Sequence, residues 1–313
     1  MNKVRLQLMI KNVLNFFGLK LIGINEYRNI NFLLETLLEG EGSYGNANTN
    51  IIIFSKDRPL QLHALLGSIE DCVTGVGATH ILYHASNTTY ESGYHRLAVE
   101  CNLPNVNWYK EEDFRADTLK ILDKIRSKLL FFLVDDIIFT EKVNCDDFKH
   151  LDTKKYILSL RLGGNLSYCY MADAKQPLPK FSPYPDVKNN EFLLWKWSDG
   201  KWDWGYPLSL DGHIFSSNEI KKIFKATFFN SPNSLESAIQ IFYYPYKRRM
   251  GVCYLKSRLV NIPNNKVQNL NKNRSQGNDP EKLHELWING FRINYRRYYG
   301  LDNKSVHEEH DLA

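Results

Sequence analysis

The sequence has little of what marks several large classes of protein. Its five cysteines are odd in number and scattered, with no Cys-x-x-Cys pair, which argues against a disulfide framework or a structural zinc site and favours a reducing compartment. No run of 18 apolar residues occurs, so no membrane-spanning helix is predicted. The first 18 residues mix Lys3, Arg5 and Lys11 with apolar residues and lack the cleavage site of a signal peptide. We therefore expect a cytoplasmic protein.

The sequence also lacks a large excess of charge of either sign. Forty Lys and Arg residues against 35 Asp and Glu give a net charge of +5 over 313 residues. That balance is too mild for a protein that coats nucleic acid and suits anionic lipid or a nucleoside diphosphate better. The apolar fraction of 43% and the charged fraction of 24% are those of a folded protein with one large or two small domains.

The N-terminal segment, residues 1–40, is predicted to be helical and basic. Its first 28 residues contain five basic side chains and one acid, Glu26. Apolar residues recur there at spacings of three and four, at Leu6, Met9, Ile10, Val13, Leu14 and Phe17. A basic amphipathic helix can lie on an anionic membrane surface, and the alternative is a helix packed on the body of the protein. A polar linker is expected over residues 41–50.

Strands and helices alternate from residue 51 onward. Strands are expected at 51–54, 79–84, 106–109 and 129–134, and helices at 59–69, 94–101 and 114–128. This order predicts an α/β fold with a mostly parallel central sheet and flanking helices, preceded by an N-terminal helical extension. Past residue 145 the pattern loosens, with strand-like pieces at 156–161 and 251–262. We divide the chain into segments 1–45, 46–145, 146–270 and 271–313.

Two carboxylates directly follow the most apolar strand. Residues 129–134 (LLFFLV) run straight into Asp135 and Asp136. Ligands of open α/β sheets bind beyond the carboxyl ends of the strands, and a hard cation relieves the repulsion between two neighbouring acids. The alternative is a solvated turn or a helix N-cap, where Asp is common.

The first strand ends in a second polar loop, Ser55 to Arg58, whose amides and charges suit a phosphate or a base. The alternative there is an ordinary strand-to-helix loop.

These segments resemble a known enzyme family. Residues 51–62 (IIIFSKDRPLQL) resemble the strand, Arg-containing loop and Leu-rich helix that open the nucleotide-sugar domain of GT-A-type glycosyltransferases. Residues 133–136 (LVDD) fall where that family has its Asp-x-Asp metal motif. More loosely, residues 204–207 and 211–215 resemble the acceptor-side loop, and residues 232–236 fall where members carry an acidic motif at a helix start. The departure is at the metal motif, which reads Val-Asp-Asp here.

The resemblance also implies a role for each of these segments. Segment 46–145 would bind the nucleotide sugar, segment 146–270 the acceptor, and segment 271–313 would be a C-terminal helix and tail. The residues implied for the nucleotide sugar are Ser55, Asp57, Arg58, Asn87 and Asp135. Asp136, with Asp135, would hold a divalent metal, Mn²⁺ or Mg²⁺, that stabilises the charge of the leaving diphosphate.

Two acids are candidates for the base that accepts the acceptor's hydroxyl proton. Glu236 is the first, at the apparent start of a helix; the alternative is a capping-box Glu three residues after an N-cap at Asn233. Asp211 is the second, and its alternative is a turn residue before Gly212. The residues expected to bind the acceptor are Trp202, Trp204, Gly212 and His213. For the two tryptophans the alternative is a loop that fills the core.

The function that this resemblance implies is glycosyl transfer. A sugar would move from a nucleoside diphosphate sugar to a glycan or lipid-linked acceptor, near the inner face of the cell membrane and without nucleic acid as a partner. One alternative is a nucleotidyltransferase, although no Gly-rich phosphate loop lies near the first strand. The other is a non-catalytic glycan-binding or scaffold subunit of the same fold, against which the candidate acids argue.

Overall fold

The computed structural model describes residues 24–39, 46–184, 191–263 and 279–310. The chain forms two compact units, Met1–Gly40 and Glu41–Ala313. The first contains the helix α2 (Ile24–Leu38), and most of the basic residues that the sequence analysis placed before it lie outside the described residues. Within the ranges described, no helix is both long and apolar enough to cross a membrane.

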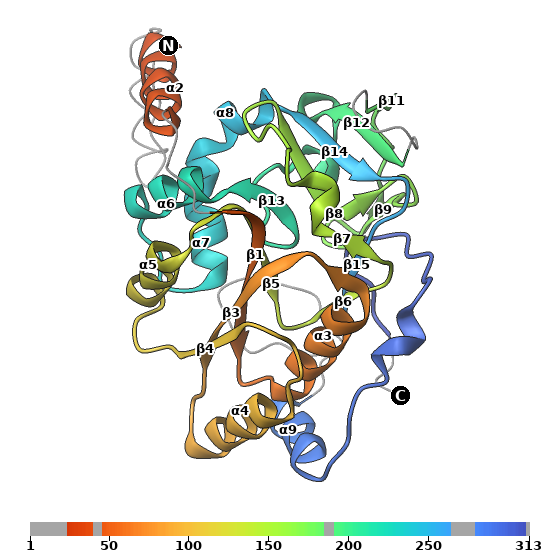
Figure 1. The fold of residues 1–313 in the computed structure, drawn as a ribbon. Helices are drawn as coiled ribbons and strands as arrows, with labels where there is room; N and C mark the ends of the chain where they lie inside the picture. The colour runs from red at the N-terminus through yellow and green to blue at the C-terminus, as the bar shows by residue number, and fades with distance from the viewer. Residues whose placement is uncertain (1–23, 40–45, 185–190, 264–278, 311–313) are drawn as a thin grey trace, which may run out of the picture. The chain divides into compact units, whose positions relative to one another are not determined.

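The second unit is built on one nine-stranded sheet among its described residues (Figure 1). In spatial order its strands are β11 (Ser182–Pro183), β12 (Phe192–Lys196), β14 (Met250–Tyr254), β8 (Tyr156–Gly163), β13 (His213–Ser216), β5 (Ser127–Val134), β1 (Asn46–Lys56), β3 (Val76–His84) and β4 (Val106–Lys110). Only β12 and β13 run against the others. The predicted α/β class with a mostly parallel central sheet is therefore confirmed.

The central strands β1 and β5 are apolar on both faces, as strands covered by helices on both sides must be. Ile51, Ile52 and Ile53 of β1 are fully buried, and so are Phe131 and Phe132 of β5. β1 pairs in parallel with β3 on one side and with β5 on the other. The two strands that the sequence marked most clearly therefore lie side by side in the interior of the sheet.

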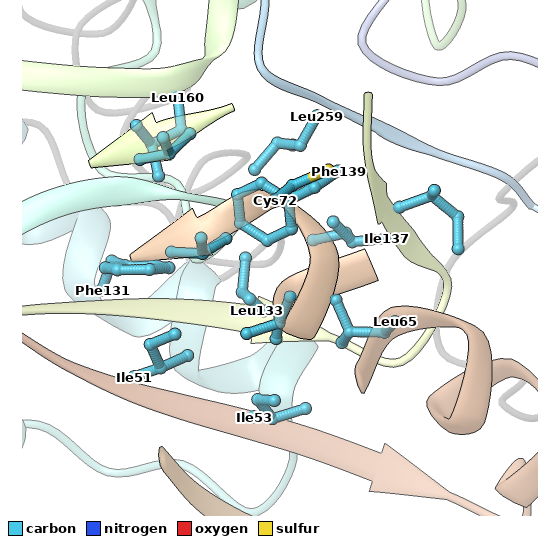
Figure 2. Close-up of a cluster of buried hydrophobic side chains, with 14 of the residues drawn as sticks. Ile51, Ile53, Leu65, Cys72, Phe131, Leu133, Ile137, Phe139, Leu160 and Leu259 are labelled. Atoms are coloured by element: carbon cyan, nitrogen blue, oxygen red, sulfur yellow. The ribbon is translucent and has the colours of Figure 1, made fainter. Parts of the chain in front are cut away.

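Helices cover both faces of this part of the sheet. The helices of the second unit are α3 (Pro59–Cys72), α4 (Thr88–Glu100), α5 (Phe114–Lys124), α6 (Ser217–Ala226), α7 (Pro232–Ile239), α8 (Tyr243–Lys247) and α9 (Pro280–Ile288). Figure 2 shows Ile53 and Leu133 on the face that Leu65 of α3 covers. On the other face the ring of Phe132 stacks on Phe224 of α6 at 5.4 Å between centroids.

Several boundaries differ from those expected. The polar stretch 46–50, predicted to be linker, is the start of β1, because pairing with β3 and β5 orders its backbone. The expected strand at 251–262 is two strands, β14 and β15 (Leu259–Asn261), and β15 pairs with β6 (Ile137–Phe139) outside the large sheet. Segments 46–145 and 146–270 share one sheet and one compact unit.

Candidate active site

A cavity of about 750 Å³ opens at the carboxyl ends of β1 and β5. The chain passes from β1 to β3 and β4 on one side of the sheet, then returns to place β5 on the other side of β1. Such a reversal of strand order leaves a crevice where ligands of open α/β sheets bind. The cavity includes seven of the residues that the sequence analysis proposed: Ser55, Arg58, Asp135, Asp136, Trp202, Asp211 and Glu236.

Buried Arg58 and Asp135 form a cluster with the part-buried Asp136 at one side of this cavity. A guanidinium nitrogen of Arg58 lies 2.9 Å from Asp135 Oδ1 and 3.3 Å from Asp136 Oδ2. The amide of Lys56 donates to the other oxygen of Asp135 at 3.1 Å. Burial raises the pKa of Asp136 to about 6; Arg58 opposes this shift, while repulsion from Asp135 and Asp211 adds to it. The cluster therefore holds more negative charge than its one arginine balances.

Asn261 of β15 completes this side of the cavity. Its amide nitrogen donates to Asp136 Oδ1 at 3.4 Å, while its own side-chain oxygen is buried without a hydrogen-bond partner. Carboxylate and amide oxygens are the ligands that Mg²⁺ and related hard cations take. In the described part of the chain no three His, Cys, Asp or Glu side chains are grouped to hold a metal. The donor set thus fits a cation that substrate oxygens help to coordinate.

Two residues proposed for the nucleotide lie outside the cavity lining. Asp57 has a left-handed backbone conformation, with φ of 54°, and its carboxylate accepts hydrogen bonds from the amide and hydroxyl of Ser86 at 2.7 and 2.5 Å. It ties the loop after β1 to the loop after β3. Asn87 is the N-cap of α4 and accepts the amide of Tyr90 at 3.0 Å. Their contacts position the loops that surround the site.

Glu236 of α7 lines another part of the cavity. Its Oε1 accepts the amide of Leu210 at 3.3 Å. Burial, with repulsion from Asp211, raises the pKa of Glu236 to about 7, although Arg161 works against the shift. Such a carboxyl is partly ionised at neutral pH and suited to taking a proton.

The helix cap that was the alternative role for Glu236 is made by other residues. The N-cap of α7 is Ser231, and Ser231 and Ser234 form the capping box, each side chain bonding the other's backbone amide. An N-cap at Asn233 is therefore wrong, and the α7 cap does not use the Glu236 carboxyl.

Three of the residues expected to bind the acceptor, Trp204, Gly212 and His213, are not among those that line the cavity. Trp204 is fully buried, and its carbonyl accepts the indole N–H of Trp195 at 3.0 Å. His213 is also buried, with a ring nitrogen 3.1 Å from the carbonyl oxygen of Pro207. Gly212 has φ of +74°, and a Cβ there would come within 2.7 Å of Leu259. Trp202 alone of this group lines the cavity, and it is 44% exposed.

The sequence analysis missed several charged or polar residues of the site, and Arg161 is the clearest. Arg161 lies on β8 and pairs with Asp211 at 3.3 Å and Asp203 at 3.6 Å. An arginine within an otherwise apolar predicted strand signals a buried charge that needs partners. Asn261 and His307, which also line the cavity, gave no such signal, because each is a single polar residue far along the chain.

Comparisons with known proteins add little to what the geometry of the cavity shows. No protein-family model and no curated protein matches the sequence. Among solved structures, the chain is similar to S. aureus TarS residues 1–349 (TM-score 0.38, 11% identity, 66% of this chain and 60% of that one) and to the same fragment in complex with UDP-GlcNAc (TM-score 0.44, 11% identity, 80% and 69%). A longer TarS structure gives a TM-score of 0.40 at 12% identity, over 66% of this chain and 35% of that one. The chain thus spans less than two thirds of the first of these structures. With TM-scores below 0.5, these similarities carry no weight for the function, which is argued below from the site's own residues.

The contrast between the two tryptophans is testable. Trp204→Ala should lower the free energy of unfolding by about 3–5 kcal/mol, because it empties a packed site. Trp202→Ala should change it by no more than about 0.5 kcal/mol, because half of that ring already faces water. Urea denaturation of both variants measures the difference, and equal losses would contradict the placement of Trp202 on the cavity surface.

Proposed function

We propose that this protein is a glycosyltransferase that moves a sugar from a nucleoside diphosphate sugar to a hydroxyl of a glycan or lipid-linked acceptor. One observation carries the proposal. A single cavity joins a charged cluster at the strand reversal, Arg58 with Asp135 and Asp136, to a part-buried carboxyl of raised pKa, Glu236. Sugar transfer needs both parts, since charge develops on the departing diphosphate while the incoming hydroxyl loses a proton.

The balance of acidic and basic residues in the cavity lining indicates how a diphosphate would bind there. Six lining residues carry carboxyl groups, and only three lining residues are Lys or Arg. An anion with several charges would be repelled by such a lining, so we infer that it binds together with a divalent cation such as Mn²⁺. Asp136, Asp135 and Asn261 are the residues that would hold this cation. When bound, it would stabilise negative charge on the leaving diphosphate as a Lewis acid.

The protein's own groups supply the rest of the chemistry. Arg58 is held at the ends of β1 and β5, where it can contact a phosphate oxygen while remaining paired with Asp135. Glu236 takes the proton of the acceptor hydroxyl as that oxygen attacks the sugar's anomeric carbon. Trp202 offers a half-exposed ring on which a sugar face can stack.

Release of nucleoside diphosphate from a panel of nucleoside diphosphate sugars tests the activity as a whole. A transferase releases the diphosphate slowly with water and faster with an acceptor. Release of pyrophosphate from a nucleoside triphosphate would point instead to nucleotidyl transfer. Neither release would indicate a binding or scaffold protein.

The donor side is tested by Asp136→Asn. We expect this variant to lose Mn²⁺-supported binding of a nucleoside diphosphate while it keeps its fold, because one negative charge and one oxygen ligand leave the cation site. Isothermal titration with and without Mn²⁺ is the measurement. Asp123→Asn is the matched control, since Asp123 is an exposed residue of α5 paired with Lys225. Unchanged affinity in Asp136→Asn would remove the cation site from the account.

The acceptor side is tested by Glu236→Gln. Loss of a positioned general base should lower the transfer rate by about 10²–10⁴-fold, with little change in nucleotide-sugar binding. In the wild type the rate should fall as the pH drops below about 7, because protonated Glu236 cannot accept a proton. Steady-state kinetics across pH measure both effects. A rate within about threefold of wild type would move the base role to Asp211, with Asp211→Asn as the next variant.

The N-terminal unit is proposed to bring the enzyme to an anionic membrane surface at the inner face of the cell membrane. Its sequence is basic before residue 29, and α2 leaves Phe32 and Leu33 largely exposed. Removal of residues 1–40 should weaken co-sedimentation with anionic vesicles more than it weakens turnover in solution. Equal vesicle binding by the truncated and full-length proteins would leave this unit without a membrane role.

A further inference from the structure

Arg161 is the cation of the acceptor side of the cavity, and its side chain is only 6% exposed. One guanidinium nitrogen lies 3.3 Å from Asp211 Oδ2 and also donates to the hydroxyl of Ser209. The other terminal nitrogen lies 3.6 Å from Asp203 Oδ1. Burial raises the pKa of Asp211, repulsion from Asp203 adds to this shift, and the Arg161 guanidinium opposes it.

A short hydrogen-bonded segment connects Arg161 to Glu236. The Ser209 hydroxyl that Arg161 contacts also accepts the amide of Asp211 at 3.2 Å. The amide of Leu210, the residue between Ser209 and Asp211, donates to Glu236 Oε1 at 3.3 Å. Residues 209–211 therefore fix where the guanidinium and the Glu236 carboxyl lie relative to each other.

The charged and titratable groups around Glu236 come from three other elements. Arg161 comes from β8, Asp211 from the loop before β13, and Tyr206 from the residue after the short helix η3 (Trp202–Gly205). Helix α6 also packs on α7, but its Glu219 is engaged by Arg249 at 2.8 Å. Within α7 itself Glu236 is the only titratable residue.

We propose that Arg161, held between Asp203 and Asp211, is a positioning residue that sets the pH range in which Glu236 can accept a proton. The inference rests on the base role proposed for Glu236. Its physical basis is that a nearby positive charge favours the ionised carboxylate, and a nearby negative charge favours the protonated acid.

Two substitutions should shift the titration of Glu236 in opposite directions. Arg161→Gln removes the positive charge, so Glu236 should remain protonated to a pH about 1 unit higher or more. Asp211→Asn removes the negative charge, so Glu236 should ionise at a lower pH by a similar amount. Arg161→Lys keeps the charge and should leave the titration close to that of the wild type. A purely structural role for Arg161 would not produce opposite shifts.

The measurement is a ¹³C NMR titration of the Glu236 side-chain carboxyl in full-length protein without substrate, assigned by comparison with Glu236→Gln. Arg249→Lys is the matched control, because Arg249 is another buried arginine paired with a carboxylate, and it should leave the titration unchanged. The acidic limb of the pH-rate profile for sugar transfer should move with the NMR titration in each variant.

Opposite shifts in Arg161→Gln and Asp211→Asn would support the proposal. No shift in either variant, or shifts in the same direction, would overturn it. If Arg161→Gln does not fold, Asp211→Asn and Arg161→Lys decide by the same criterion: a shift in the first with none in the second supports the proposal, and any other result overturns it. The NMR titration needs no transfer activity, so failure of the proposed function shows separately, as no release of nucleoside diphosphate by the wild type.

Discussion

The contact of Arg58 with Asp135 and Asp136 is the interaction on which the rest of the site depends. Two adjacent carboxylates at the end of a buried strand are costly without a cation, and parallel pairing of β1 with β5, with Phe54 opposite Val134, brings the arginine to them. The same pairing fixes the start of α3, whose N-cap residue is Arg58. The pairing of β1 with β5 therefore determines both the register of these two strands and the positions of the charged groups at their carboxyl ends.

Two charged clusters with different tasks share the cavity. Around Arg58 the carboxylates outnumber the arginine and suit a cation that arrives with an anionic substrate. The Arg161 guanidinium is already paired with Asp203 and Asp211, and the part-buried Glu236 has a raised pKa. In the reaction that we propose, one cluster would meet negative charge as it develops, and the other would take up a proton. The presence of both clusters in one cavity is the reason for proposing transfer between two bound substrates over binding of one ligand.

The sequence predicted the parts of this protein whose signals are local. Apolar runs marked β1 and β5, helical spacing marked α3, and the charged residues after each strand marked one part of the cavity lining. The part around Arg161 was harder to predict, because its contacts join distant parts of the chain: Arg161 contacts Asp211 fifty positions later. Trp204 and His213 looked like ligands for sugar because aromatic and polar residues fill walls as well as sites, and only packing separates the two roles. The cap on α7 shows the same difficulty, since two serines made a box that the sequence also offered to Asn233 and Glu236.

A crystal structure of the full-length protein with a nucleoside diphosphate and Mn²⁺ tests the central claim most directly. The account predicts the diphosphate at the carboxyl ends of β1 and β5, within reach of Arg58. It predicts the Mn²⁺ between the phosphate oxygens and Asp136. It also predicts that the terminal phosphate, which would carry the sugar, is directed toward Glu236. A nucleotide bound elsewhere on the molecule, or a diphosphate on the far side of the cavity from Asp136, would contradict it.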